Sequence, residues 1–176
     1  LLLACSVAFN LLARSGIYSQ TCCVLGMIVL ETGQVDEAIA QFQKALALQP
    51  ANTQARLSLG EALVQKDRVK DALVEFQNAL EIEPHNLEAH NSLGILLLQQ
   101  GNVAAAIPHL RRVMAAHPGV SQACFNLGSA LLQSGRLDEA LKSIDAGIEA
   151  IREFLDEYDR IEQAGQCAEL VNLEQW

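Results

Sequence analysis

Residues 53–86 read TQARLSLGEALVQKDRVKDALVEFQNALEIEPHN, and the spacing within this stretch recurs along the chain. Three features return at one fixed spacing: a Leu-Gly pair at positions 25–26, 59–60, 93–94 and 127–128, an alanine at 38, 72, 106 and 140, and a proline at 50, 84 and 118. Several independent columns share one period in one register, which indicates an internal repeat.

The repeat divides most of the chain into four units, 19–52, 53–86, 87–120 and 121–154. Each unit has two apolar-periodic stretches of about 13 residues, the length of an ordinary helix. Residues that tolerate a left-handed backbone separate the two stretches, namely Gly33, Asp67, Gly101 and Gly135. The second helix is expected to start near Asp36, Lys70, Val103 or Asp138, and the proline ends it. The pattern predicts an all-α array of antiparallel helix pairs without a sheet.

Small residues are expected where the two helices of a unit cross. Gly26 and Ala38, with their counterparts in the later units, let the two backbones approach closely because they have little or no side chain.

This arrangement resembles the tetratricopeptide-repeat (TPR) family. The first unit matches its pattern with Leu25-Gly26, Ala38, Phe42, Ala45 and Pro50, and the second with Leu59-Gly60, Ala72, Phe76, Ala79 and Pro84. The third unit has Leu110 and Val113 at the later positions and Pro108 inside its second helix, where we expect a bend. The fourth has Ile144 and Gly147, with Arg152 in place of the proline. The resemblance covers residues 19–154 and implies a right-handed superhelical solenoid.

The two ends are less regular than the repeats. Residues 1–18 fit the second helix of a truncated preceding repeat, as in a fragment or processed product, and residues 155–176 form an acidic helix extension and tail. The last helix is expected to run from Asp138 to about Ala164 and to stop at Gly165. Apolar tail residues could cover the groove or an end of the array, or mediate self-association; these are Leu170, Val171, Leu173 and Trp176.

Charge and composition exclude several classes of protein. Twelve Lys and Arg against 21 Asp and Glu give a net charge of −9, which argues against nucleic-acid binding. The longest apolar run, 22–30, is far shorter than the ~18 residues that a membrane span needs. Five cysteines without a C-x-x-C pair favour a reducing compartment, and hence a cytoplasmic location. Alternatively, residues 2–5 (LLAC) resemble a bacterial lipoprotein cleavage box, which would anchor the chain through a lipidated Cys5.

No motif of an active site is present. The sequence lacks nucleophile-elbow, phosphate-loop and dinucleotide motifs, and its histidines, at 85, 90, 109 and 117, form no i,i+4 pair. The paired acids at 36–37 and 138–139 lie at helix starts, where they favour the positive end of the helix dipole. We therefore expect a non-enzyme with no cofactor, metal or small-molecule substrate.

The resemblance implies that a partner binds in a concave groove lined by the first helices. The implied positions are Gln20, Cys23, Met27, Leu30, Glu31, Gln54, Leu57, Glu61, Val64, Gln65, Glu88, Asn91, Ile95, Leu98, Gln99, Gln122, Phe125, Ser129, Leu132 and Gln133. Nine of these are apolar, seven are amides, three are glutamates and none is basic.

The lack of cations argues against a clamp for a C-terminal carboxylate, because the matching positions have no Lys or Arg; they are Cys23, Met27, Ser58, Glu88 and Ser92. An amphipathic helix or extended apolar peptide with basic residues fits better. The sequence thus predicts a protein–protein interaction scaffold, an adaptor or assembly factor. The alternatives are an accessory module of a larger enzyme and a bacterial envelope-assembly lipoprotein.

Overall fold

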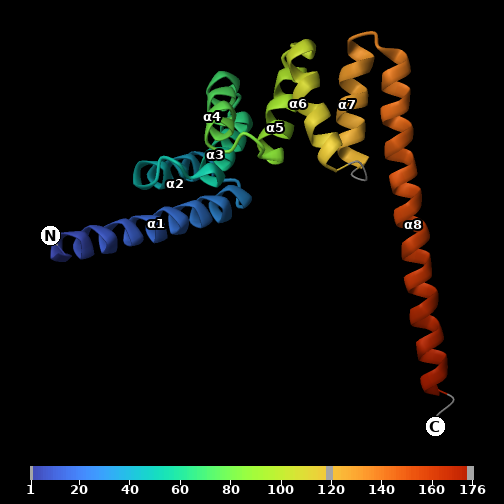
Figure 1. The fold of residues 1–176 in the computed structure, drawn as a ribbon, viewed down its shortest axis with the longest axis horizontal. Helices are drawn as coiled ribbons and strands as arrows, with labels where there is room; N and C mark the ends of the chain where they lie inside the picture. The colour runs from blue at the N-terminus through green and yellow to red at the C-terminus, as the bar shows by residue number, and fades with distance from the viewer. Residues whose placement is uncertain (1, 118–120, 174–176) are drawn as a thin grey trace. The chain divides into compact units, whose positions relative to one another are not determined.

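The computed structural model describes residues 2–117 and 121–173, with side-chain positions for 15–117, 122–153, 155, 156 and 160. In these residues the chain forms eight helices and no strand (Figure 1). The helices are α1 (Leu2–Glu31), α2 (Val35–Leu48), α3 (Thr53–Gln65), α4 (Val69–Ile82), α5 (Leu87–Gln99), α6 (Val103–Ala116), α7 (Ser121–Gln133) and α8 (Leu137–Leu173). The all-α prediction is confirmed, whereas the boundaries of the repeat units stay a prediction.

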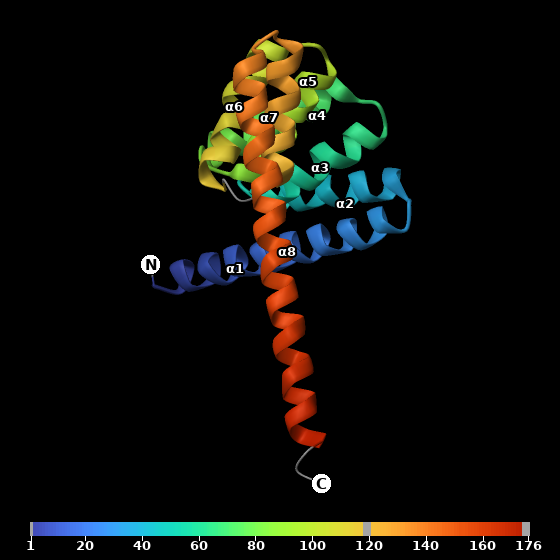
Figure 2. The same ribbon diagram turned by 90° about the vertical axis from the view of Figure 1, so that its right-hand side faces the viewer.

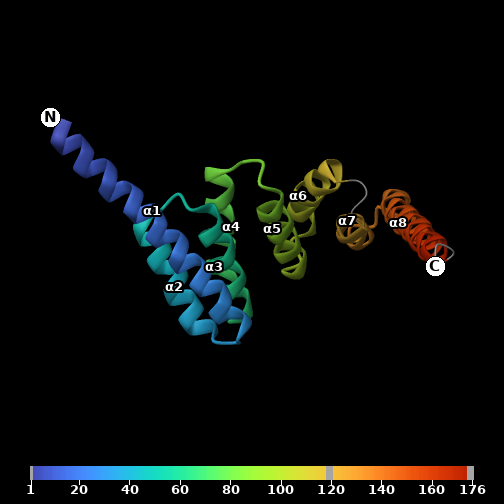
Figure 3. The ribbon, with the colours of Figure 1, turned by 90° about the horizontal axis from the view of Figure 1, so that it is seen from below.

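The chain divides into two compact units, Leu1–Leu96 and Leu97–Trp176. In the first unit α1 packs against α2 and α3 against α4, and α3 also contacts α2 and α1. In the second unit α7 packs against both α6 and α8, and Figure 3 shows α8 beside α7. Thus α2 and α6, the second helices of their pairs, each pack on the first helix that follows.

The turn inside each predicted repeat has the same backbone geometry. Gly33, Gly101 and Gly135 have φ of 80°, 74° and 76°, and Asp67 has 59°. At the first turn the Gly33 N–H donates to the Leu30 carbonyl at 2.9 Å and the Gln34 N–H to the Val29 carbonyl at 3.2 Å. This pair of bonds is the Schellman motif, which closes a helix through a left-handed residue.

Close approach of the paired helices depends on a glycine in three of the Leu-Gly pairs, at Gly26, Gly60 and Gly128. A Cβ on Gly26 would lie 2.6 Å from the Phe42 ring, and one on Gly60 would lie 2.5 Å from the Phe76 ring. Both rings are buried. In the second unit, a Cβ on Gly128 would lie 2.7 Å from Ile144. These contacts give the glycines the packing role that the spacing predicts.

Residues 1–18, predicted to be the second helix of a truncated preceding repeat, do not form a helix separate from the next one, because α1 is one continuous helix of 30 residues. Glycine in a helix interior costs only about 1 kcal/mol relative to alanine, so Gly16 does not end the helix without a proline or a tertiary turn. The result is a first helix that extends well beyond α2, as Figure 2 shows.

The predicted stop at Gly165 is also wrong, since α8 continues through it to Leu173. The same small cost applies, and the neighbouring residues, Ala164 and Gln166, are helix formers. The apolar residues assigned to a tail lie outside the residues whose side chains are described. In the third predicted repeat, α6 runs through Pro108 without interruption.

Candidate partner-binding groove

A buried polar network holds the first helices of the first unit in register. The Ser19 hydroxyl of α1 donates to the Ala45 carbonyl of α2 at 2.9 Å and accepts from the Asn52 amide at 3.0 Å. The Asn52 side-chain oxygen in turn accepts from the Ala55 N–H at 3.0 Å, which caps α3. Three helices therefore share one network, which positions the groove residues of α1 and α3. This network was not predicted, and its only signal in the sequence was a serine and an asparagine separated by nearly one repeat.

A single hydrogen bond has the corresponding role in the second unit. The Ser143 hydroxyl of α8 donates to the Cys124 carbonyl of α7 at 2.8 Å, and both residues are buried. This bond joins α7, which contains groove positions of this unit, to its hairpin partner.

Thirteen of the predicted groove positions lie in the first unit, and the structure does not leave all of them accessible. The exposed ones are Gln20, Glu31, Gln54, Glu61, Gln65 and Glu88. The half-buried ones are Met27, Leu30, Val64, Asn91 and Ile95. Cys23 and Leu57 are buried, with 0% and 1% of their surface exposed.

The assignment of Cys23 and Leu57 to the groove is therefore wrong. Both side chains face the helix-packing interior, which excludes direct contact with a partner in this conformation. Burial also raises the pKa of the Cys23 thiol, with a smaller contribution from Cys22. It likewise raises the pKa of the Cys124 thiol. Both cysteines are thus kept as neutral thiols in the core.

The seven remaining groove positions lie in the second unit and are more open. Leu98 is half-buried, and the exposed positions are Gln99, Gln122, Phe125, Ser129, Leu132 and Gln133. Phe125 and Leu132 leave 40% and 45% of their surface exposed. They are two helical turns apart on α7, so they share one face of the helix with Ser129.

The ionisation of one predicted groove glutamate, Glu61, depends on its surroundings in the first unit. Partial desolvation raises the pKa of Glu61 on α3, and the negative charge of Glu88 on α5 raises it further. The sequence places no cation among the groove positions, and the ion pairs of the described residues involve other acids. The groove positions of the first unit therefore include acidic side chains with no basic residue among them.

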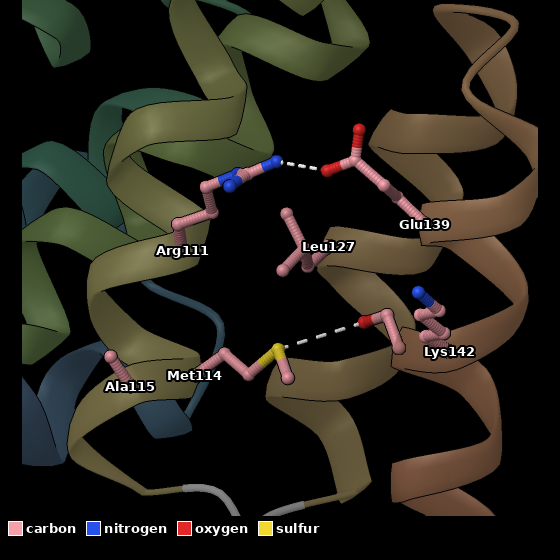
Figure 4. A pocket seen from close by; sticks show the side chains of 7 residues that line it. Arg111, Met114, Ala115, Leu127, Glu139 and Lys142 are labelled. Carbon is pink, nitrogen blue, oxygen red and sulfur yellow. Dashed lines mark hydrogen bonds and ion pairs between the residues drawn. The ribbon is translucent and has the colours of Figure 1, made fainter.

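A pocket of about 390 Å³ in the second unit, shown in Figure 4, was not predicted from the sequence. Its lining comes from three helices: Arg111, Met114 and Ala115 of α6, Leu127 of α7, and Glu139, Lys142 and Ser143 of α8. The sequence indicated this pocket only through two opposite charges, Arg111 in the second helix of the third repeat and Glu139 in the second helix of the fourth.

An ion pair closes one side of this pocket. Arg111 pairs with Glu139, and Arg136 pairs with the same carboxylate at 2.6 Å. Hydrogen bonds from Arg136 first, and then from Arg111, lower the pKa of Glu139. The Ser143 hydroxyl contacts the Met114 sulfur at 3.7 Å. These interactions connect α6 to α8 and therefore have a structural role. Because the pKa of Glu139 is lowered, its carboxylate stays ionised and is unsuited to be a general acid.

The part of the chain that the structure describes contains neither a group of metal-ligating side chains nor a helix that could span a membrane. No group of three or more His, Cys, Asp or Glu side chains among these residues could hold a metal ion. Within the same residues, no helix combines the length and the apolar character that crossing a bilayer requires.

Comparisons with solved structures place the fold among known repeat proteins. A crystal structure of MamA is similar with a TM-score of 0.74 and 24% identity, over 78% of this chain and 81% of that one. MamA residues 41 to the end from Desulfovibrio magneticus RS-1 match with a TM-score of 0.72 and 21% identity, over 77% of this chain and 76% of that one. YrrB, described as a TPR protein with an unusual peptide-binding site, matches with a TM-score of 0.68 and 27% identity, over 73% and 66%.

Two kinds of sequence comparison were informative in different ways, and the matches to family models agree with the structural comparisons. None of the curated proteins matches this chain in sequence. One family model described as tetratricopeptide repeat matches residues 68–107 and 97–165, and a second with the same description matches residues 23–86. The chain belongs to the tetratricopeptide-repeat family.

Proposed function

We propose that this protein is an interaction scaffold that binds an apolar protein segment containing Lys or Arg on the first helices of its repeats. Family membership supports the general role, because tetratricopeptide-repeat proteins are typically non-enzymatic scaffolds. YrrB is described as having a peptide-binding site, which supports a peptide ligand for this fold. The observation that supports this ligand chemistry comes from the first unit, where the predicted groove positions include partly accessible apolar side chains, Met27 and Val64, and glutamates with no cation among them.

Apolar burial is expected to supply most of the affinity. Phe125 and Leu132 are the most exposed apolar groove residues, and covering the accessible part of each is worth roughly 1 kcal/mol. Met27, Val64 and Ile95 are half-buried and would contribute less. An amphipathic helix or an extended peptide presents apolar side chains at a spacing that suits such a face.

The glutamates are expected to select the ligand's charge and orientation. Glu61 and Glu88 repel each other, so a Lys or Arg placed near both relieves this repulsion. Because Glu61 is exposed, the gain is limited and salt reduces it. A cationic ligand would therefore bind faster and somewhat more tightly than a neutral one, and an acidic ligand would be disfavoured.

The proposal can be tested with two labelled peptides that share one amphipathic leucine pattern but contain either Lys or Glu on the polar face. Fluorescence anisotropy is expected to show at least tenfold tighter binding of the Lys peptide, with a smaller difference at high salt. Phe125→Asp should weaken binding of the Lys peptide by about tenfold, a loss of roughly 1.4 kcal/mol.

Val74→Asp is the matched control, because Val74 is a similarly exposed apolar residue on a second helix, α4, with 51% of its surface accessible. It should leave the affinity within a factor of two. The proposal fails if the Lys peptide does not bind, if both peptides bind equally, or if Val74→Asp weakens binding as much as Phe125→Asp. Circular dichroism of each variant checks that the helices are retained.

The remaining assignments stay predictions. A cytoplasmic location, the lipid anchor at Cys5, the role as an enzyme's accessory module and the envelope-assembly role each await direct measurement. Mass spectrometry of the mature N-terminus from the native source would detect an acylated Cys5.

A further inference from the structure

The outer faces of the first and last helices expose large apolar side chains. On α1, Ile17, Leu25 and Ile28 leave 67%, 43% and 54% of their surface accessible. They lie along an open hollow of about 500 Å³ that Gln20, Thr21 and Val24 also line. On α8 the corresponding stripe consists of Leu137, Leu141, Ile148, Ile151 and Leu155, all at least 41% exposed.

Two residues of the α1 face, Leu25 and Ile28, indicate its role, because their equivalents are buried in every later first helix. Leu25 is 43% exposed, whereas the residues one, two and three repeats further on, Leu59, Leu93 and Leu127, are 4%, 2% and 5% exposed. Ile28 is 54% exposed, whereas its equivalents Ala62, Leu96 and Ala130 are at most 2% exposed. In α3 and α7 a preceding second helix, α2 or α6, packs on the first helix. Among the helices that the structure describes, no preceding second helix packs on the outer face of α1, so this stacking face is uncovered there.

The α8 stripe is the other half of the same kind of interface. Leu141 is 57% exposed, but its equivalents Ile107 and Ile39 are 7% and 8% exposed. Those two residues belong to α6 and α2, which each pack on a following first helix. Val35 and Val103, the equivalents of Leu137, are half-buried in the same helices. The outer face of α8 is therefore also a stacking face, on which none of the described helices packs as a following first helix.

We propose that the outer face of α8 in one copy of this protein packs on the outer face of α1 in a second copy, in the way that α2 packs on α3 and α6 on α7. The contact continues the chain's own stacking interface between molecules. A second copy is the occupant because its α1 has the matching surface. The equivalent first helices, α3 and α7, already pack against the apolar stripes of α2 and α6 within one molecule.

Charge disfavours a contact between two α8 faces and permits the contact of α8 with α1. The α8 stripe is bordered by exposed acids, including Asp138, Asp145 and Asp156, so two α8 faces would bring carboxylates together. The α1 segment 15–30 contains no charged residue, so it meets the α8 border without repulsion.

The direction and the length of the helices both favour an antiparallel contact of α8 with α1. The short connection 49–52 joins α2 to α3, so the end of the second helix lies beside the start of the next first helix. In the same arrangement, the end of α8 would lie beside the start of α1 in the second copy. Both helices extend beyond their hairpin partners, α8 with 37 residues and α1 with 30 residues (Figures 1 and 2). At about 1.5 Å per residue, the two extensions can pair over about 20 Å beyond the stacking stripe.

The proposed contact uses two different faces, so a pair of molecules still has one free face of each kind. Such heterologous contacts continue into longer assemblies or rings instead of ending at a dimer. The average mass of the wild-type protein should therefore rise with concentration past the dimer.

Sedimentation velocity over a roughly hundredfold concentration range tests this with two double variants. Leu25→Glu/Ile28→Glu blocks the α1 face, and Leu141→Glu/Ile148→Glu blocks the α8 face. Each variant alone should stay monomeric. Their equimolar mixture should form a complex of twice the monomer mass and nothing larger, because only one α8 face and one α1 face remain open.

Val74→Glu on α4 is the control and should assemble like the wild type. Ile17→Glu, at the most exposed large apolar residue of α1, should reproduce the loss at the α1 face, and circular dichroism should show wild-type helix content for each variant. A monomeric wild type at every concentration overturns the proposal. Dimers of the α8-blocked variant alone would show α1–α1 contact, dimers of the α1-blocked variant alone would show α8–α8 contact, and either result also overturns it.

Discussion

Gly60→Ala is the sharpest test of how the helix pairs pack. The added Cβ would lie 2.5 Å from Cε1, 2.8 Å from Cζ and 2.9 Å from Cδ1 of Phe76. The Phe76 ring is 1% exposed, so it cannot move aside into solvent. The methyl group can be accommodated only if α3 and α4 move apart or the ring leaves its preferred rotamer.

The expected cost follows from two opposing effects. Overpacking a filled core costs about 1–3 kcal/mol, and replacing glycine by alanine in a helix returns up to about 1 kcal/mol. The free energy of unfolding should therefore fall by about 1 kcal/mol or more, which for a chain of this size lowers Tm by about 2–4 °C.

Gly16→Ala is the matched control, because Gly16 is also inside a helix and nothing lies within 4 Å of its added Cβ. This substitution should instead stabilise the protein by about 0.5–1 kcal/mol. Urea and thermal unfolding followed by circular dichroism measure both changes.

A second background isolates the steric contact. In Phe76→Leu the side chain opposite Gly60 is smaller, as it is naturally at Leu110 in the third repeat, so Gly60→Ala should cost less there. The reasoning is refuted if Gly60→Ala stabilises as Gly16→Ala does, or if its cost is the same in both backgrounds.

Three other changes test the turn, the buried network and the groove charge. Asp67→Gly should raise the free energy of unfolding by about 0.5–1 kcal/mol in urea titrations, since Asp67 has φ 59° and glycine adopts that region without strain. Ser19→Ala should lower the free energy of unfolding by about 1–3 kcal/mol, because the Ala45 carbonyl and the Asn52 amide lose their buried partner; an unchanged midpoint would contradict the network. The pKa of Glu61 is raised in the folded state, so its ionisation opposes folding as pH rises from the unfolded pKa, about 4.3, through the folded one. Glu61→Gln should thus gain stability relative to the wild type at neutral pH and lose that gain in acid, and NMR titration of the Glu61 carboxyl carbon should show the raised pKa directly.

Much of the fold was predictable from the sequence because it depends on local steric rules. The left-handed turns at Gly33, Gly101 and Gly135 need residues that accept positive φ, and the sequence shows them at one period. The close approach at Gly60 follows in the same way, because a glycine and a phenylalanine recur at one separation within the first two hairpins.

Site prediction was less complete, because a repeat pattern gives a residue's position on its helix but not its depth. Cys23 and Leu57 occupy groove positions of the pattern, yet neighbouring helices bury them. The influence of Glu88 on the pKa of Glu61 also depends on the separation of two residues on different helices, which no spacing within one helix reveals.

The sequence by itself determined the all-α repeat, its turns and the absence of basic residues from the groove positions, since each depends on residue type and periodic spacing. Only the tertiary structure decided where the end helices stop and which apolar side chains remain exposed. Gly16 and Gly165 are weak local signals that a continuing helix overrides at a cost of about 1 kcal/mol each. Leu25 and Leu59 occupy the same repeat position, but only Leu59 has a preceding helix packed on its face, because burial is a property of neighbours and not of the residue.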